Sequence, residues 1–296
     1  MSVLVAAVEA GSLSAASRRL GTPLPTVSRK VAELEAHLGT QLLIRSTRRL
    51  RLTDAGAAYV EACRRILEEV TEAERAASGE YTAPRGDLLV TAPVVFGRLH
   101  VLPVVTGFLA QFPEINVRLL LSDRNVHLVD DHVDVAVRIG ALPDSLLVAT
   151  RVGTLRRVVC ASPDFLSAHG EPKTPAALSD LSCITFDALG SAESWGFAIP
   201  GSTATQTVPV RSRLSVNTAE AAIDAAVAGV GVTRVLSYQA ADAVAAGRLR
   251  IVLVPFEFAP IPVSLLHAPG RVPLKLRAFL DVAAPALRKT LAALAV

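Results

Sequence analysis

The segment that most constrains the fold of this chain is residues 21–53, which open with a predicted amphipathic helix over residues 23–38. Thr22 and Pro23 are typical of a helix start, where Thr can cap free N–H groups and Pro loses no hydrogen bond. Four apolar residues recur at helical spacing: Val27, Val31, Leu34 and Leu38. We therefore expect a helix with one face packed on a small core.

The opposite face of this predicted helix carries short polar and cationic side chains: Thr26, Ser28, Arg29 and Lys30. A helix of this kind can enter the major groove of DNA, where such groups hydrogen-bond to base edges and phosphates. We expect these four residues to contact DNA.

Two short helical patterns precede this helix. Residues 3–8 predict a helix ended by Gly11, and residues 15–20 predict a second helix ended by Gly21. The second helix carries two cations that we also expect to contact DNA: Arg18 and Arg19. Two helices joined by a tight turn, the second with a polar face, form a helix-turn-helix.

After Gly39, residues 42–44 and 50–52 are apolar runs that predict a short β-hairpin, the wing of a winged helix-turn-helix. The tip of this wing is basic and polar: Arg45, Thr47, Arg48 and Arg49. Such a tip is suited to phosphates or to a minor groove.

The positive charge of the chain is concentrated at this end. Residues 1–53 hold eight Arg or Lys and three Glu, a net charge of +5, whereas the whole chain carries +3, so the remainder carries −2. A basic segment on a slightly acidic body favours double-stranded DNA as the partner of that segment alone.

A long helix is expected from Thr53, which can cap it, to about Ala77. Its apolar positions form a narrow stripe: Ala58, Ala62, Ile66, Val70, Ala73 and Ala77. A stripe this narrow suits pairing with a second helix in a homodimer better than burial in a large core. The alternative is a helix packed on its own domain. Residues 78–85 lack periodicity and predict a linker.

From residue 87 the pattern changes to short apolar strands separated by helices. Strands are expected at 87–91, 115–121, 133–139, 146–152, 156–161, 183–186, 208–216, 231–235, 251–254 and 263–267. Helices are expected at 97–112, 125–130, 163–169, 218–228, 237–246 and after residue 273. This alternation predicts an α/β body whose sheet is covered on both faces.

Several motifs in register resemble the N-terminus of LysR-type transcriptional regulators: EAGSLSAA at 9–16, RRLG at 18–21, PTVSR at 25–29 and LTDAG at 52–56. The order of the downstream elements also matches, so the resemblance covers nearly the whole chain. It implies a multidomain α+β fold: a winged helix-turn-helix, a long linker helix and a C-terminal effector-binding domain with two α/β lobes, like a periplasmic binding protein.

On this resemblance, residues 1–53 are the DNA-binding domain, 54–85 the dimerising helix and hinge, and 86–296 the effector-binding domain. Lobe one is expected at 86–158 plus 262–296, and lobe two at 159–261. The family usually carries Gln where this chain has Leu24, so base reading is expected to depend on the other residues of the helix. It also usually has more residues before the first helix, which we expect to be short here.

Small ligands of such two-lobed domains bind between the lobes, at strand ends and helix N-termini, where free N–H groups favour anions. The candidate effector contacts are Thr91, Pro93, Val94, Asn125, Arg138, Asn217, Thr218 and Thr233. Each also has a purely structural alternative. Asn217 and Thr218 could serve only as a helix cap, Arg138 as a surface cation and Thr91 as a strand end.

No Gly-x-Ser-x-Gly, His-Glu-x-x-His or phosphate-loop motif occurs in the sequence, so we expect neither enzyme activity nor a cofactor. The metal-like cluster of His127, Asp130, Asp131, His132 and Asp134 has a spacing that places its two histidines on different sides of a helix. No metal is expected there. Trp195 and Phe197 are expected to serve packing or to line a cleft.

The three cysteines are scattered, without metal-type spacing, and are expected to be buried free thiols. No segment is expected to reach the length of a membrane span, and the N-terminus lacks the basic leader of a signal peptide. We therefore expect a cytoplasmic protein with no membrane partner.

Two hypotheses follow. The first is a sequence-specific transcriptional regulator that binds a dyad-symmetric DNA site as a homodimer or tetramer. It is controlled by a small-molecule effector, for which an anion is one option. The alternative is a small-molecule binding protein or enzyme that uses the α/β body, with the N-terminal helices serving assembly. The missing catalytic motifs weigh against the alternative.

Overall fold

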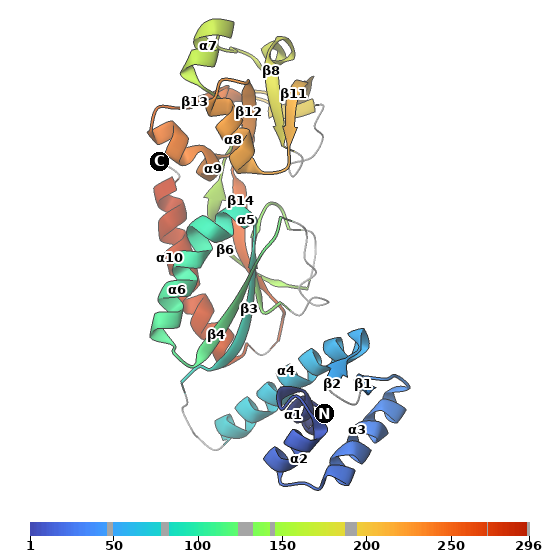
Figure 1. The fold of residues 1–296 in the computed structure, drawn as a ribbon. Coiled ribbons are helices and arrows are strands. Elements are labelled where there is room, and N and C mark those ends of the chain that lie inside the picture. The colour runs from blue at the N-terminus through green and yellow to red at the C-terminus, as the bar shows by residue number, and fades with distance from the viewer. Residues whose placement is uncertain are drawn as a thin grey trace. The chain divides into compact units, whose positions relative to one another are not determined.

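The computed structural model describes residues 1–45, 50–77, 83–123, 133–142, 146–186, 194–270 and 272–294. The chain divides into two compact units, Met1–Ala83 and Pro84–Val296, drawn as a ribbon in Figure 1. Each unit has its own hydrophobic core.

The N-terminal unit is a winged helix-turn-helix followed by a long helix, as the sequence predicts. Its elements are α1 (Ser2–Glu9), α2 (Leu13–Leu20), α3 (Leu24–Leu38), β1 (Leu43–Arg45), β2 (Leu50–Leu52) and α4 (Asp54–Ala77). Ser12 caps α2, because its Oγ accepts a hydrogen bond from the Ala15 N–H at 3.1 Å. Gly21 ends α2 in a left-handed conformation with a φ of 59°.

The start of α3 differs from the prediction, because Thr22 does not cap it. The Thr22 N–H donates to the Ser17 carbonyl at 3.1 Å, and its hydroxyl donates to the Leu20 carbonyl at 3.2 Å. Both groups therefore belong to the turn that ends α2, and Pro23 occupies the N-cap position of α3 without a side-chain hydrogen bond.

The apolar stripe of α3 packs on the core of the unit except at its last residue. Val27 and Val31 lie in the core of the unit with Leu4 and Leu42, whereas Leu38 is 38% exposed. Leu34 is partly buried against the same core. The predicted stripe is thus correct at Val27, Val31 and Leu34 and wrong at Leu38, where the helix has run past the small core.

Helix α4 has two different halves. Thr53 caps it as predicted, accepting from the Gly56 N–H at 2.9 Å, and Val60 and Cys63 are buried against the unit's own core. Further along, Ile66 and Val70 are 44% and 47% exposed. The alternative of packing on its own domain therefore holds for the first half, while the predicted stripe is exposed at Ile66 and Val70. The side chains of Ala73 and Ala77 lie outside the described residues.

The C-terminal unit contains two five-stranded sheets, one in each lobe. Lobe one has the strand order β4 (Ile115–Leu121), β3 (Gly86–Ala92), β5 (Val135–Ile139), β14 (Ile261–His267) and β6 (Val148–Leu155). Its helices are α5 (Val94–Phe96), the π-helix η1 (Gly97–Val101), α6 (Leu102–Gln111) and α10 (Leu274–Leu294). The sheet is mixed, since β14 runs antiparallel to β5 and β6.

Lobe two has the strand order β11 (Arg211–Val216), β8 (Ser182–Phe186), β12 (Val232–Leu236), β7 (Arg157–Ala161) and β13 (Arg250–Val252). Its helical segments are α7 (Pro163–His169), η2 (Pro175–Asp180), α8 (Ala219–Val227), α9 (Ser237–Ala245) and η4 (Val254–Phe256). A separate hairpin, β9 (Ser194–Ala198) with β10 (Thr205–Pro209), carries Trp195 and Phe197, which are buried beside Val159 as the predicted packing residues.

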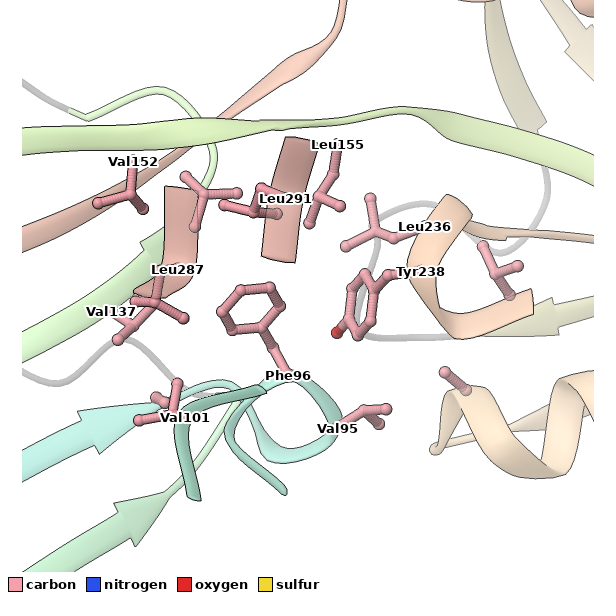
Figure 2. Close-up of a cluster of buried hydrophobic side chains, with 14 of the residues drawn as sticks. Val95, Phe96, Val101, Val137, Val152, Leu155, Leu236, Tyr238, Leu287 and Leu291 are labelled. Carbon is pink, nitrogen blue, oxygen red and sulfur yellow. The ribbon is translucent and has the colours of Figure 1, made fainter. Parts of the chain in front are cut away.

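Two chain segments connect the lobes, one between β6 and β7 and one between β13 and β14. One hydrophobic cluster continues across this junction, and Figure 2 shows Phe96 of lobe one beside Tyr238 of lobe two, with Leu155, Leu236 and Leu291 around them. The rings of Phe96 and Tyr238 pack edge to face with centroids 5.3 Å apart.

One continuous helical run, Val94–Gln111, is long and apolar enough to cross a membrane by length and composition alone, with a mean hydropathy of 1.4. The expectation that no segment reaches this length is therefore wrong. Phe96, Val101, Val105 and Phe108 of this run are buried in the core of lobe one, so a core helix of a globular domain accounts for the pattern.

The three cysteines are free and buried, as expected. Within the described residues no group of three or more His, Cys, Asp or Glu side chains could hold a metal ion. Asp134 instead accepts a hydrogen bond from the Leu89 N–H at 2.7 Å. The other four members of the metal-like cluster lie outside the described residues.

Candidate DNA-binding surface and effector site

The exposed face of α3 presents the residue types that the sequence predicts for DNA contact. Arg29 and Lys30 are exposed, and Thr26 and Ser28 are half-buried between them and the core. Arg29 lies along the helix, with its Nε 3.6 Å from Glu33 Oε1. Leu24 at the helix start is 41% exposed and adds an apolar group to the same end of α3.

The two arginines of α2 have different surroundings. Arg19 Nη1 lies 2.8 Å from Glu9 Oε2, and the other oxygen of that carboxylate lies 4.0 Å from Arg64 Nε. Glu9 therefore links α1 with α2 and α4, and Arg19 has a structural partner. Arg18 is exposed and forms no ion pair with any described residue, which leaves its charge available for a phosphate.

Glu35 is a positioning residue that the predicted contact set does not include. Its Oε1 accepts hydrogen bonds from the N–H groups of Leu42 and Leu43, at 2.9 and 3.0 Å. Because Leu43 begins β1, this carboxylate fixes where the wing starts relative to α3. The sequence offers little signal for this role, because it shows only that Glu35 lies near the end of the predicted helix, seven residues before Leu42.

The wing is an antiparallel hairpin with Leu43 opposite Leu52 and Ile44 opposite Arg51. Arg51 is exposed on β2 and adds a cation that the predicted contact set omitted. Thr47, Arg48 and Arg49 lie outside the described residues, as does the side chain of Arg45, so their predicted contacts stay predictions.

In lobe one, the structure brings Thr91 and Arg138 onto one face of the sheet. Thr91 pairs with Ala136 of β5, and Arg138 lies two residues further along the same strand. The Thr91 hydroxyl and Arg138 Nη2 are buried and have no hydrogen-bond partner among the described residues. Burial lowers the pKa of Arg138 from its usual value. Buried polar groups of this kind normally have partners, so both are suited to a bound ligand.

The helix start after β3 is less open to an anion than expected. Pro93 occupies the N-cap position of α5, and the Val94 N–H donates to Asp123 Oδ1 at 3.0 Å. The carboxylate of Asp123 thus already fills the place of an anion there. The Val94 side chain remains partly exposed as an apolar surface.

In lobe two, the hydroxyl candidates have structural partners. Thr218 Oγ1 accepts from the Ala221 N–H at 3.3 Å and caps α8, while the buried Thr233 donates to the Ile184 carbonyl at 3.2 Å. Asn217 is exposed beside Thr218. Asn125 lies outside the described residues.

Across the lobe junction, polar and aromatic contacts link η1 to lobe two. Arg98 Nη2 lies 3.4 Å from Glu220 Oε1 of α8, and the His100 ring packs against Tyr238 with centroids 5.6 Å apart. Burial lowers the pKa of His100, against the opposing effect of the Asp242 charge. These contacts tie the two lobes together on one side of the junction.

Comparison with known proteins agrees with this architecture. Residues 1–57 match the family described as bacterial regulatory helix-turn-helix protein, lysR family, and residues 82–288 match the LysR substrate binding domain. The chain is 37% identical, over 94% of its length and 82% of the relative, to an HTH-type transcriptional regulator of Xanthomonas campestris pv. campestris. It is 32% identical, over 95% of its length and 92% of the relative, to the probable regulator LtrA of Klebsiella pneumoniae.

A solved structure of CrgA, a LysR-type transcriptional regulator from Neisseria meningitidis, superposes with a TM-score of 0.61 at 30% identity and covers 97% of both chains. The two family models together, the relatives and the CrgA structure all span both the DNA-binding unit and the effector-binding lobes. The family consists of DNA-binding regulators and not of enzymes, so the alternative hypothesis of an enzyme is set aside. The chain therefore belongs to the LysR family of transcriptional regulators, with an N-terminal helix-turn-helix that binds DNA and a C-terminal domain that binds an effector.

Proposed function

We propose that this regulator acts in the cytoplasm as a homodimer, paired through α4, on a dyad-symmetric DNA site. The observation that carries this proposal is the exposure of Ile66 and Val70 on the half of α4 that does not pack on its own unit. An apolar stripe between charged residues is stabilised when a second helix covers it. In a tetramer, two such dimers would associate, each still paired through α4.

We divide the chain into a DNA-binding domain over 1–53, a dimerising helix and hinge over 54–85, and an effector domain over 86–296. In this division lobe one comprises 86–156 plus 261–296, and lobe two comprises 157–260, because β7 of the lobe-two sheet begins at Arg157 and β14 of the lobe-one sheet begins at Ile261. The boundaries expected from the sequence are thereby shifted by one or two residues. The division is supported by the helix cap at Thr53 and by the strand order of the two sheets.

The proposed DNA contacts are Arg18, Arg19, Thr26, Ser28, Arg29, Lys30, Arg45, Thr47, Arg48 and Arg49. Their support differs, since Arg18 and Lys30 are exposed cations without a described ion pair, whereas Arg19 also bonds Glu9. Cations at phosphates position the protein on the duplex, and base edges are read by the shorter side chains of α3.

The proposed effector contacts are Thr91, Pro93, Val94, Asn125, Arg138, Asn217, Thr218 and Thr233. Thr91 and Arg138 have the strongest support, because both present buried polar atoms without a described partner. Thr218 and Thr233 would act through the backbone that they hold. A buried guanidinium in this set favours an anionic effector.

The mass of the full chain in solution tests the pairing. Light scattering should give a dimer or tetramer for the native chain, whereas Ile66→Glu with Val70→Glu should give monomers that lose DNA affinity. Ala55→Glu with Ala57→Glu is the matched control, since this double variant adds the same charge at two exposed positions on the half of α4 that packs on its own unit, outside the stripe. Monomeric native protein that binds DNA with full affinity would rule the pairing out.

A further inference from the structure

Lobe two contains a pair of partly buried arginines that the contacts proposed above do not include. Arg157 is the first residue of β7 and follows the segment that crosses from lobe one. Arg234 lies on β12, with Val159 as its partner, while Arg157 is opposite Leu236. The two side chains therefore lie on the same face of the sheet, diagonally across neighbouring strands, at its lobe-junction end.

Arg234 is held by groups that carry no charge. Its Nη1 donates to the Gly196 carbonyl of β9 at 3.1 Å, and its guanidinium lies 5.2 Å from the centre of the Trp195 ring. Burial, together with the nearby charge of Arg157, lowers the pKa of Arg234 to about 10. The pair is thus two cations close together in apolar surroundings.

Arg157 lacks even this compensation. Its Nε is buried and has no hydrogen-bond partner among the described residues, and burial lowers its pKa. In the described part of the chain no carboxylate pairs with either guanidinium. Glu257, on the second crossing segment, instead lies 3.6 Å from Arg156.

Two like charges that are partly buried, with no carboxylate beside them among the described residues, are unfavourable for the fold, because burial removes the water that would otherwise solvate them. A bound anion would remove this cost by supplying the missing charge and the missing acceptor. The Nε–H and one Nη–H of an arginine point the same way and match the two oxygens of a carboxylate. The apolar neighbours Trp195 and Val159 favour a monoanion over a more strongly hydrated phosphate dianion.

We propose that Arg157 and Arg234 form a carboxylate-recognition site at the lobe-junction end of lobe two, and that the effector of this regulator carries a carboxylate group. The inference rests on the proposed function, in which a small molecule binds between the lobes. It adds two cations of lobe two to a proposed site whose other cation, Arg138, lies in lobe one.

Trp195 is the single tryptophan of the chain, so its fluorescence reports on this site in the intact protein. The full chain is titrated with acetate and benzoate, and with acetamide, benzamide and phosphate as comparisons, at constant ionic strength. We expect a saturable change with a carboxylate, with a Kd on the order of millimolar for such small probes, and none with the amides. Equal responses to acid and amide, no response to either acid, or tighter binding of phosphate would overturn the proposal.

Substitution of Arg157 separates recognition from general charge effects. Arg157→Gln should weaken carboxylate binding by at least about tenfold, and Arg157→Lys, which keeps the charge without the fork, should also weaken it. Arg213→Gln is the control, because Arg213 is exposed on β11 of the same lobe. Unchanged affinity in folded Arg157→Gln, checked by its melting temperature, would overturn the assignment, and Arg157→Lys gives the same test if the Gln variant does not fold.

Failure of this site and failure of the proposed function give different results. If the chain binds DNA but no carboxylate changes the Trp195 fluorescence, the carboxylate site is ruled out and the role as a regulator stands. If the chain forms no dimer on DNA, the proposed function is ruled out, whether or not a carboxylate changes the Trp195 fluorescence.

Discussion

The hydrogen bonds of Glu35 to the start of the wing lead to the sharpest prediction about the DNA-binding unit. Glu35→Ala removes the acceptor of two N–H groups, those of Leu42 and Leu43, whose residues are 2% and 4% exposed. Each hydrogen bond to a charged group contributes about 1.5–3 kcal/mol, and a buried N–H left without a partner costs a similar amount. Partial access of water reduces the sum, so we expect a loss of about 2–4 kcal/mol in the local stability of the wing.

Glu35→Gln separates charge from geometry. Both hydrogen bonds end on the same oxygen, Oε1, which an amide can replace. Gln should therefore keep both bonds without charge assistance and lose about half as much stability as Ala. Glu33→Ala is the matched control, because Glu33 lies on the same helix with a side chain that is 65% exposed and, among the described residues, forms an ion pair with Arg29 alone. It should change stability by less than about 0.5 kcal/mol.

Hydrogen exchange of the full chain, followed for the peptide that contains residues 40–45, measures the local opening directly. Exchange in Glu35→Ala should be faster by a factor on the order of 30 to 1,000, which corresponds to the expected loss of stability. DNA affinity should fall with it, since the wing is no longer held in place. Equal exchange in Glu35→Ala and Glu33→Ala would refute the role of this carboxylate.

Three further predictions concern other parts of the chain. Replacing Arg18 or Lys30 with Ala should weaken binding to all DNA sequences and reduce the salt slope by about 1 each, whereas Arg19→Ala should also lower the melting temperature because it frees Glu9. Gly56→Ala should destabilise the N-terminal unit by more than about 2 kcal/mol in a melting experiment, since a Cβ would lie 2.0 Å from the Leu42 carbonyl oxygen. Gly107→Ala is the control and should be neutral or stabilising, because a Cβ there meets nothing within 4 Å. His100 has a lowered pKa, so the folded state resists its protonation, and stability that is present above the unfolded pKa of about 6.5 should be lost as the pH falls toward the folded value. His100→Gln should flatten the melting temperature between neutral and mildly acidic pH, and an unchanged pH profile would contradict this.

The fold was predictable where the signal is local. The stripe of Val27 and Val31, the cap at Thr53 and the glycine ends of α2 and α3 follow from spacing within a few residues, and the structure has them all. The predicted cap of α3 at Thr22 was wrong, because the N–H and the hydroxyl of Thr22 bond carbonyls at the end of α2 instead. Strand β9 was not predicted, because Gly196 interrupts its apolar pattern. Its partner β10 and the next strand β11 were predicted as one strand over residues 208–216.

The candidate site was less predictable because its partners come from distant segments. Nothing in the sequence around Thr233 tells that its hydroxyl bonds the Ile184 carbonyl, or that Asp123 occupies the Val94 N–H. The nearness of Arg157 and Arg234 likewise depends on the register of β7 against β12. Residue type and spacing could point to the strand ends, but only the pairing of strands decides which side chains face one another.

We propose that a pair of these chains binds DNA with two-fold symmetry, through α3 and the wing. The most direct test is to select bound fragments from genomic DNA with the purified full chain and to determine their shared sequence. Paired chains should select an inverted repeat whose half-sites lie about one helical turn, or a multiple of it, apart. Fragments that share only an asymmetric site, or no site at all, would contradict it.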